Sequence, residues 1–331
     1  MPPLVSVIVP CYNEQATVRK LLEAIYNQSY PRDRLEVVIA DGLSTDGTHT
    51  EIAAFQSAYP DLRVQVVDNP KRIIPAGLNR AVMAARGEFI LRLDAHSMPY
   101  PDYVSRCVEA LISGLGDNIG GVWEICPGGE NWQAQAIAVA AAHPLGVGDA
   151  RYRLGGHPQE VDTVPFGAFR RSLVDQIGLF DETLLTNEDY EFNVRLRQAG
   201  GRIWLDPAIQ TTYIARQTFS ALARQYWRYG YWKARMLRRY PGTFRWRQIA
   251  GVFVLSFLIL GLLGFWYPLA WWLLGMEAGL YFLVLVIASL QVAYQRRDPV
   301  LLFSVPLAIA IMHFAWGTAF LWSLASSFLA K

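Results

Sequence analysis

The sequence is poor in cysteine. Its 331 residues contain three, Cys11, Cys107 and Cys126. Their spacing matches no metal-ligand pattern, and an odd number cannot be paired completely in disulfides. The sequence therefore argues against a disulfide-stapled fold, and we expect the protein to work in a reducing compartment.

The amino terminus lacks the basic start and the cleavage site of a signal peptide. Its first residues, MPPLVSVIVP, instead contain a β-branched run that is typical of a buried strand. We therefore expect a folded domain to begin at once and to remain inside the cell.

Charge is scarce in the last quarter of the chain. Between Ile249 and Ala330 the charged residues are Glu277, Arg296, Arg297 and Asp298, although the whole chain is 18% charged and 53% hydrophobic. This contrast predicts a soluble part followed by a membrane region that begins at residue 248. The region has room for about three helical spans of roughly 20 residues each.

We expect these spans to occupy Ile249 to about Trp266, about Ala278 to Tyr294, and part of Leu301 to Phe328, where Pro306 interrupts the run. The aromatic stretch WYPLAWW would lie at the far membrane interface, where tyrosine and tryptophan are enriched.

Acidic residues are absent just before the first predicted span. From Arg224 to Arg247 the chain has eight basic residues and no Asp or Glu, with tyrosine and tryptophan interleaved. This pattern predicts interfacial helices over residues 216–247, against anionic lipid on the cytoplasmic side; a merely solvated helix face is the alternative. The excess of positive charge predicts a multi-pass inner (cell) membrane protein whose amino-terminal domain is cytoplasmic.

The first 215 residues alternate apolar runs with helical patterns. LVSVIVP, LEVVIADG, RVQVVD and EFILRLD are typical of strands, and helices are expected from Ala16 to Asn27, about Thr48 to Ala58, and Pro75 to Ala85. Such alternation predicts an α/β class, with a mostly parallel, doubly wound sheet and right-handed crossovers.

Polar residues follow three of these predicted strands. In parallel sheets ligands bind beyond the carboxyl ends of the strands, so these residues predict one polar rim. Alone, Asp46 could cap a helix and Asn13 could be a turn residue. The rim residues are Tyr12, Asn13 and Glu14, then Asp41, Gly42, Ser44 and Asp46, and then Asp94 and His96.

Five segments together carry a family resemblance. VSVIVPCYNE, ADGLSTDGT, GLNRA, LRLDAH and NEDYEFNVRLRQAG occur in the order typical of the family 2 glycosyltransferases, which have the inverting GT-A (Rossmann-like) fold and use nucleotide-diphosphate sugars. The resemblance covers roughly Leu4 to Gly230. DAHSMPYPDY, FGAFRR and the short hydrophobic tail resemble the branch of succinoglycan-type exopolysaccharide glycosyltransferases.

The resemblance implies a metal site at Asp94 and His96. The family usually has Asp-x-Asp here, and His96 takes the place of the second acid. If the strand geometry continues through Ala95, both side chains point to one face and can approach one cation. A carboxylate with an imidazole favours Mn²⁺ over Mg²⁺. His96 could instead face a phosphate without binding metal.

The resemblance also implies where the donor binds. Pro10, Tyr12 and Glu14 would line the base and ribose, and Asp41 would accept a hydrogen bond from the base, in our expectation N3–H of uracil, which favours a UDP-sugar. The residues alone indicate only a polar, open rim. Asp46 and Asn79 are further candidates for this part of the site.

Glu188 and Asp189 lie near the expected start of a helix, where a carboxylate is stabilised by the helix dipole. Helix capping is the alternative explanation. In the family, the Asp of this pair is the general base that an inverting transfer requires. Glu188 and Asp189 are therefore the catalytic candidates.

Further along the chain, RQYWRYGYWK resembles the Gln-x-x-Arg-Trp motif of membrane-embedded synthases, through Gln225 and Arg228, with Tyr229 in place of Trp. The resemblance implies that Arg228 contacts the donor diphosphate. The glycine- and arginine-rich segment from Gly146 to Arg171 could be a mobile loop over the donor, an acceptor surface, or a plain surface loop.

These features predict a metal-dependent inverting glycosyltransferase that passes a sugar to a membrane-held acceptor, in our expectation a polyprenyl-linked sugar of surface or exopolysaccharide synthesis. A processive polysaccharide synthase and a non-catalytic nucleotide-sugar-binding recruiter are the alternatives. We expect the bilayer and a lipid-linked or saccharide acceptor as partners, and no nucleic acid. The sequence leaves the oligomeric state open.

Overall fold

The computed structural model describes residues 1–245 and 249–329. These residues form two compact units. Unit 1 contains Met1–Glu124 and Gly155–Tyr213, and unit 2 contains Ile125–Leu154 and Ile214–Lys331. The sequence pattern had indicated a boundary near residue 215, but nothing in it indicated that residues 125–154 group with the C-terminal helices.

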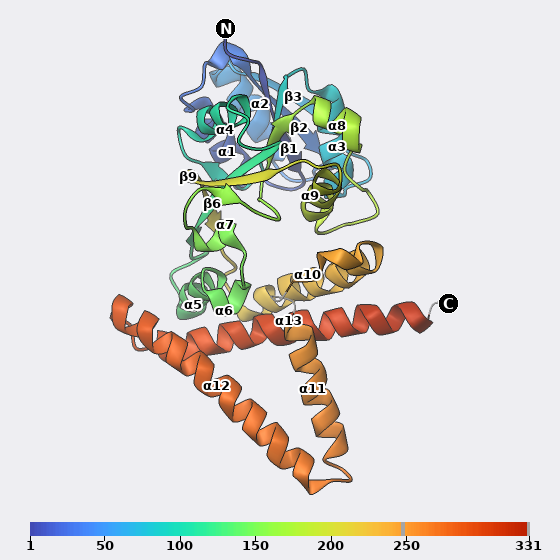
Figure 1. Ribbon diagram of the computed structural model, residues 1–331. Coiled ribbons are helices and arrows are strands. Elements are labelled where there is room, and N and C mark those ends of the chain that lie inside the picture. The colour runs from blue at the N-terminus through green and yellow to red at the C-terminus, as the bar shows by residue number, and fades with distance from the viewer. Residues whose placement is uncertain (246–248, 330–331) are drawn as a thin grey trace. The chain divides into compact units, whose positions relative to one another are not determined.

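Unit 1 is built on one sheet with the strand order β3-β2-β1-β4-β8-β6-β9-β5, and β7 pairs with β9 (Figure 1). The pairs β1–β2, β2–β3 and β1–β4 are parallel, whereas β8 is antiparallel to both β4 and β6. The sheet is therefore mixed: its first half is parallel, as predicted, and its second half is not. The strands are β1 Val5–Cys11, β2 Leu35–Asp41, β3 Arg63–Asp68, β4 Phe89–Arg92, β5 Met98–Pro99, β6 Asn118–Cys126, β7 Gln159–Glu160, β8 Ala168–Arg170 and β9 Ile203–Ile214.

The helices of unit 1 bury apolar faces against this sheet. In α1 the buried residues Val18, Leu21, Leu22 and Ile25 recur at the three- and four-residue spacing of one helix face. They pack in the core with the inward side of β1. The helices are α1 Val18–Tyr26, α2 Thr48–Ala58, α3 Ile74–Ala84, α4 Tyr103–Ile112, α8 Ser172–Ile177 and α9 Glu188–Gln198.

The strand order reverses at β1. The chain proceeds from β1 outward to β2 and β3, and then α3 carries it back to β4 on the other side of β1. A β-carbon added at Gly77 of α3 would lie 3.4 Å from the side chain of Pro10, so α3 packs closely on the face opposite the α1 core. The carboxyl ends of β1 and β4 thus form a topological switch point, the place where open α/β sheets bind ligands.

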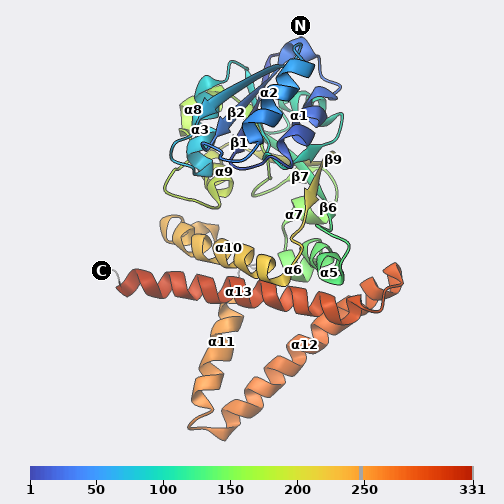
Figure 2. The same ribbon diagram turned by 180° about the vertical axis from the view of Figure 1, so that it is seen from behind.

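Unit 2 consists of helices. Thr218 caps the start of α10, where its side chain accepts a hydrogen bond from the Ala221 N–H. Figures 1 and 2 both show α10 running beside α13. Arg247, the last residue of the predicted basic segment, lies outside the described residues. The helices are α5 Trp132–Ala141, α6 Pro144–Val147, α7 Arg151–Leu154, α10 Phe219–Arg239, α11 Ala250–Leu263, α12 Pro268–Arg296 and α13 Leu301–Leu329.

Two helices of the described chain are long and apolar enough to cross a membrane, Pro268–Arg296 and Leu301–Ser326, and a third, Gly251–Leu263, is shorter. Three full spans were expected. The expected second span, about Ala278 to Tyr294, lies within α12, which begins earlier, at Pro268. Pro306 does not interrupt α13, which continues through it.

Helices α10 and α13 approach closely at Gly230. A β-carbon at this position would lie 2.1 Å from the backbone oxygen of Trp316, whereas one at Gly279 of α12 would meet open space. We expect Gly230→Ala to destabilise unit 2 by about 1–3 kcal/mol, the usual cost of overpacking, and Gly279→Ala to have no such effect. Thermal unfolding of the detergent-purified full chain measures both; equal melting temperatures for the two variants would contradict the close contact.

Candidate active site

The loops after β1 and β2 are joined by hydrogen bonds. The Asn13 N–H donates to the Ser44 hydroxyl (2.8 Å), and the Thr45 N–H donates to the Asn13 side-chain oxygen (2.8 Å). Asn13 has a positive φ of 54°, which asparagine tolerates better than most residues. Asn13 therefore adopts a turn conformation, one of the two interpretations that the sequence allowed. Its hydrogen bonds connect the loops after β1 and β2 into a single rim.

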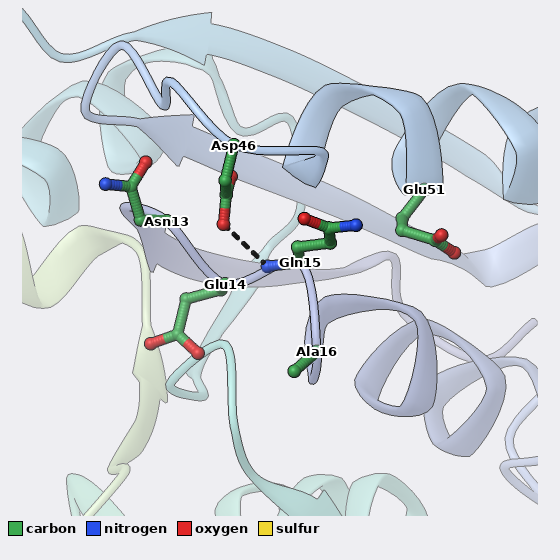
Figure 3. A pocket seen from close by; sticks show the side chains of 6 residues that line it. All are labelled: Asn13, Glu14, Gln15, Ala16, Asp46 and Glu51. Carbon is green, nitrogen blue, oxygen red and sulfur yellow. Dashed lines mark hydrogen bonds between the residues drawn. The ribbon is translucent and has the colours of Figure 1, made fainter.

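A pocket of about 440 Å³ lies on this rim (Figure 3). Figure 3 shows Asp46 directed at the Gln15 backbone, whose N–H it binds at 3.2 Å. Its other oxygen accepts from the Thr48 N–H and hydroxyl, at 3.0 and 2.5 Å. The bond from the Thr48 hydroxyl lowers the pKa of Asp46. Asp46 thus accepts the first N–H of α2 from the position before the N-cap residue, Gly47. The pocket is lined by Asn13, Glu14, Gln15, Ala16, Asp46 and Glu51.

Asp41 is fully buried at the end of β2. Its Oδ1 accepts from the Ser44 hydroxyl (2.5 Å), and its Oδ2 accepts from the Ser44 N–H (2.9 Å) and from His49 Nε2 (2.9 Å). A carboxylate has about four lone-pair positions, and these contacts occupy three of them. His49 was not among the predicted site residues; its place in the first turn of α2, beside the Asp-Gly-Thr segment, was the available signal.

Tyr12 and Gly42 lie together where the base was expected. Tyr12 is 44% exposed, and the Arg72 guanidinium lies 5.7 Å from the centre of its ring. A β-carbon at Gly42 would come within 2.9 Å of the Tyr12 ring, so only glycine fits beneath it. The rim thus has an exposed aromatic side chain packed against Gly42, the residue after Asp41.

Asn79 has contacts other than those expected for a nucleotide ligand. Its side-chain nitrogen donates to the Phe180 carbonyl (2.9 Å) and to Glu182 (3.0 Å), and its oxygen accepts from the Phe180 N–H (2.8 Å). Lys71 also binds Glu182, at 2.5 Å. Asn79 therefore connects the segment before α9 to α3. A contact between Asn79 and the nucleotide donor would have to form in addition to these hydrogen bonds.

Arg92 joins the predicted metal-binding carboxylate to the predicted catalytic pair. It is the last residue of β4 and is 6% exposed. Its Nη2 lies 3.2 Å from Asp94 Oδ1 and 2.9 Å from Glu188 Oε1. The guanidinium thus holds the acid that follows β4 beside the acid that begins α9. Arg92 was not among the predicted site residues, although an arginine inside the apolar run FILRLD was a signal.

Arg92 also has an unsatisfied donor. Its buried Nη1 has no hydrogen-bond partner in the described part of the chain. Buried donors of this kind are rarely left unmatched in native proteins, and guanidinium groups bind phosphates well. Arg92 is therefore suited to an anionic ligand at this rim.

Asp94 and His96 do not continue the strand. β4 ends at Arg92, and residues 94–97 form a turn in which the Ser97 N–H donates to the Asp94 carbonyl. The condition for Asp94 and His96 to share one strand face, extended geometry through Ala95, is therefore not met. His96 Nδ1 lies 3.1 Å from Glu14 Oε1, across the rim. Although burial opposes the change, hydrogen bonds from His96 and Thr17 lower the pKa of Glu14.

The residues present fit a divalent cation anchored through Asp94. Asp94 is a partly exposed carboxylate, with 25% of its side chain accessible. Among the described residues no three His, Cys, Asp or Glu side chains form a ready metal cage. A cation held by one or two carboxylates and completed by substrate phosphates needs no such cage. Asp94 is its natural anchor, and His96 lies two residues away.

Glu188 and Asp189 open α9, after Asn187 in the left-handed conformation (φ 69°). Burial raises the pKa of Glu188 to about 7, against the opposing charge of Arg92. Burial likewise raises the pKa of Asp189, which Arg92 also opposes. Asp189 accepts the Tyr190 N–H at 2.7 Å and remains partly exposed. It is thus an accessible carboxylate that is more basic than an ordinary aspartate.

Gln225 and Arg228 lie on α10 in unit 2. Gln225 donates to the Tyr229 hydroxyl (2.8 Å) and accepts from Arg216 (3.3 Å). The tyrosine that replaces the motif's tryptophan therefore supplies a hydroxyl that fixes the glutamine. Arg228 is exposed.

Comparison with known proteins decides the family. Residues 6–178 match the family described as Glycosyl transferase family 2. The chain belongs to this family. The succinoglycan biosynthesis protein ExoA of Rhizobium meliloti (strain 1021) is 30% identical over 318 residues, which cover 95% of this chain and 93% of ExoA. This family 2 protein is accordingly a glycosyltransferase.

Another relative has a name that specifies its reaction. It is the dolichyl N-acetyl-alpha-D-glucosaminyl phosphate 3-beta-D-2,3-diacetamido-2,3-dideoxy-beta-D-glucuronosyltransferase of Methanococcus voltae, 26% identical over 321 residues that cover 93% of each chain.

Solved structures agree on the fold. The mannosyltransferase PcManGT from Pyrobaculum calidifontis, in complex with GDP-Man and Mn²⁺, superposes with a TM-score of 0.65 at 20% identity, over 98% of this chain and 88% of that one. S. aureus TarS 1–349 with UDP-GlcNAc has a TM-score of 0.52 at 17% identity, over 98% and 92%. Unit 1 therefore has the GT-A fold that the sequence predicted.

Proposed function

We propose that this family 2 glycosyltransferase is an inverting, metal-dependent enzyme that transfers a sugar from a nucleoside diphosphate to a lipid-linked acceptor in surface or exopolysaccharide synthesis. One observation carries the proposal. Arg92 holds Asp94, the metal anchor, beside Glu188 and hence beside the neighbouring Asp189. The groups needed at the leaving diphosphate and at the attacking hydroxyl thus occur on one rim.

The leaving side needs positive charge. When bound, a divalent cation stabilises the negative charge that develops on the β-phosphate as the sugar C1–O bond breaks. Asp94 would hold it, with His96 as a further ligand or a phosphate contact. The buried Arg92, with Nη1 unmatched in the described chain, adds fixed positive charge nearby.

The attacking side needs a base. Asp189 takes the proton of the acceptor hydroxyl as that oxygen attacks C1 from the face opposite the diphosphate. Its raised pKa makes it a stronger base than an exposed aspartate. Glu188 is held by Arg92 and positions the pair.

Removing the charge of Arg92 is expected to move the acid limb of the pH–rate profile upward. Asp189 must be ionised to accept a proton, so the rate is lost as pH falls through its pKa. Arg92 counteracts the rise in that pKa. Arg92→Met should therefore shift the limb up by about one pH unit, and Arg92→Lys, which keeps the charge, should leave it near wild type. Profiles of kcat/KM measure this, and coincident limbs for the two variants would contradict it.

A uridine donor is proposed from the family resemblance, in which Asp41 accepts N3–H of uracil. Because the Asp41 carboxylate is buried and accepts from Ser44 and His49 in this structure, the base would displace one of these partners. Pro10 and Glu14 complete this side of the proposed donor site, with Asp46 bracing the loop, and Gln225 and Arg228 are proposed to contact the diphosphate.

The acceptor is inferred from the C-terminal region. Helices able to enter a membrane, preceded by a basic and aromatic helix, would keep the enzyme at a surface to which lipid-linked substrates are confined. A relative covering nearly the whole chain is named for a reaction on a dolichyl-linked sugar phosphate. Both support a polyprenyl-linked acceptor, and the basic residues of α10 are the reason for proposing a catalytic unit on the cytoplasmic side.

The test is hydrolysis of a panel of UDP-, GDP- and dTDP-sugars by the detergent-purified protein, with Mn²⁺, Mg²⁺ or chelator. We expect metal-dependent consumption of one UDP-sugar. Consumption of a GDP-sugar would overturn the uridine assignment. A protein that binds a donor but never turns it over, even with membrane lipid extract added, would be the recruiter.

A further inference from the structure

Helix α13 is long and apolar enough to span a membrane. The elements that pack against it, however, are those expected around a helix that lies at the membrane surface. We propose that α13 lies flat in the membrane interface beside α10, and that the hairpin of α11 and α12 is the part of unit 2 that enters the bilayer. The C-terminus then stays on the same side of the membrane as the catalytic unit, and α13 crosses nothing.

The first observation is the contact with α10. The two helices run side by side in both views, and Gly230 lies directly against the Trp316 backbone, near the middle of each helix (Figures 1 and 2). α10 contains six Lys or Arg residues in 21 and no acid. Such a helix is not expected within hydrocarbon, where charged side chains are strongly unfavourable. Because α13 packs along the length of α10, α13 is not expected to cross the hydrocarbon either.

The second observation concerns the middle of α13. His313 Nε2 donates to the Leu145 carbonyl of α6 at 2.7 Å, and its Nδ1 accepts from the Tyr281 hydroxyl at 2.8 Å. His313 lies 12 residues, or about 18 Å, along α13. If α13 spanned the bilayer, α6 would lie near mid-depth, and the charged Asp149 would follow it closely. Short helices and loops are not exposed to lipid at that depth.

The third observation is the single exposed stripe of α13. Phe303, Leu307, Thr318, Trp322 and Ala325 are exposed. Their spacing places them on one helix face, whereas Val305, Ala308, Ile309, Met312 and Ala319 on other faces are buried. A helix lying on a bilayer has one such apolar face.

The hairpin leaves from this same face. Phe314 continues the stripe, and its ring lies 6.1 Å from that of Phe253 and 5.6 Å from that of Phe257, both on α11, and 6.4 Å from that of Tyr281 on α12. The two helices that project from the stripe are themselves exposed and apolar. Of the most apolar 18-residue stretch of α12, 11% is buried, compared with 44% for that of α13. The bilayer is thus the occupant that covers the stripe.

Helix ends and charges agree with this arrangement. The turn between α11 and α12 exposes Phe265, Trp266 and Tyr267, residues suited to the far interface. The basic Arg296 and Arg297 end α12 at the level of the cationic α10, where anionic headgroups would neutralise both.

The test uses spin labels on the full-length protein in vesicles of phosphatidylethanolamine and phosphatidylglycerol. Single cysteines replace Phe303, Leu307, Thr318 or Trp322 in a variant whose three native cysteines are alanine. Relative collision rates with oxygen and a nickel chelate report depth. Positions 303 and 322 are separated by about 28 Å along the helix, and we expect all four labels at one shallow depth. A label at position 318 near the bilayer centre would overturn the proposal.

A second measurement is independent of the labels. Green fluorescent protein or alkaline phosphatase is fused to the C-terminus of the intact chain, and for comparison is inserted between Trp266 and Tyr267. We expect the C-terminal reporter on the side of the amino-terminal domain and the inserted one on the opposite side. A C-terminus opposite the amino-terminal domain would mean that α13 crosses. Spin–spin broadening at positions 303 and 322 would mean that a second copy of the chain covers the stripe, and would also overturn the proposal.

Discussion

Asp189→Asn is expected to abolish sugar transfer while leaving donor binding intact. The substitution keeps the size of the side chain and its place at the start of α9, where Asp189 accepts the Tyr190 N–H. It removes the group that takes the acceptor proton, and loss of a general base typically costs about 10²- to 10⁴-fold in rate. We therefore expect kcat to fall by that factor and the dissociation constant of the donor to change less than about threefold, because the base does not bind the nucleotide.

Two matched variants make the Asp189 result decisive. Asp175→Asn makes the same chemical change at an exposed aspartate of α8 and should leave kcat unchanged. Glu188→Gln tests the other carboxylate of the pair, which is held by Arg92 at 2.9 Å. Full transfer by Asp189→Asn together with loss of transfer in Glu188→Gln would show that Glu188, not Asp189, is the base.

Asp94→Ala is expected to remove the metal dependence of the reaction along with the reaction itself. Asp94 is the carboxylate that follows β4 at the switch point, and a cation anchored there would offset the charge that forms on the leaving diphosphate. Loss of one such electrostatic contact costs about 10²- to 10³-fold in kcat. The affinity of this variant for Mn²⁺ in the presence of UDP, measured by electron paramagnetic resonance, should fall together with kcat. This measurement distinguishes loss of a metal ligand from a general defect of the enzyme.

His96→Ala distinguishes the two roles left open for the histidine. His96 contacts Glu14 at 3.1 Å in this structure. If it binds metal, Mn²⁺ affinity should fall in this variant as well. If it faces a phosphate, Mn²⁺ affinity without nucleotide should be kept and donor affinity should fall. His157→Ala, at an exposed loop position, is the control. Unchanged Mn²⁺ binding in Asp94→Ala would contradict the metal anchor altogether.

The parallel half of the fold was predictable because its signals are local. Helix α2 was expected over Thr48–Ala58 and is found there, and α1 and α3 differ from expectation by one or two residues. The longer strands of the antiparallel half, β6 and β9 with 9 and 12 residues, were missed although they are long enough to show a period, but its short strands were missed for a physical reason. β5, β7 and β8 are two or three residues long, too short to show a period, and they are held by pairing with strands distant in sequence.

The site was predictable as a set of strand ends but not as a set of contacts. Topology alone brings the residues after β1, β2 and β4 to one rim. It does not reveal that Arg92 bridges to Glu188, almost a hundred residues away, or that a turn redirects His96 toward Glu14. Such pairings depend on side-chain directions after the strands end, where the alternation of a strand no longer applies.

The measurement that tests the central claim most directly is transfer from the consumed nucleotide sugar to a polyprenyl-linked acceptor, with the anomeric configuration of the product determined by nuclear magnetic resonance. We predict that Mn²⁺-dependent transfer adds one sugar to the lipid fraction with inverted configuration, and that Asp189→Asn forms no product. Retained configuration would contradict the single-displacement mechanism, and a ladder of long products would show instead a processive polysaccharide synthase.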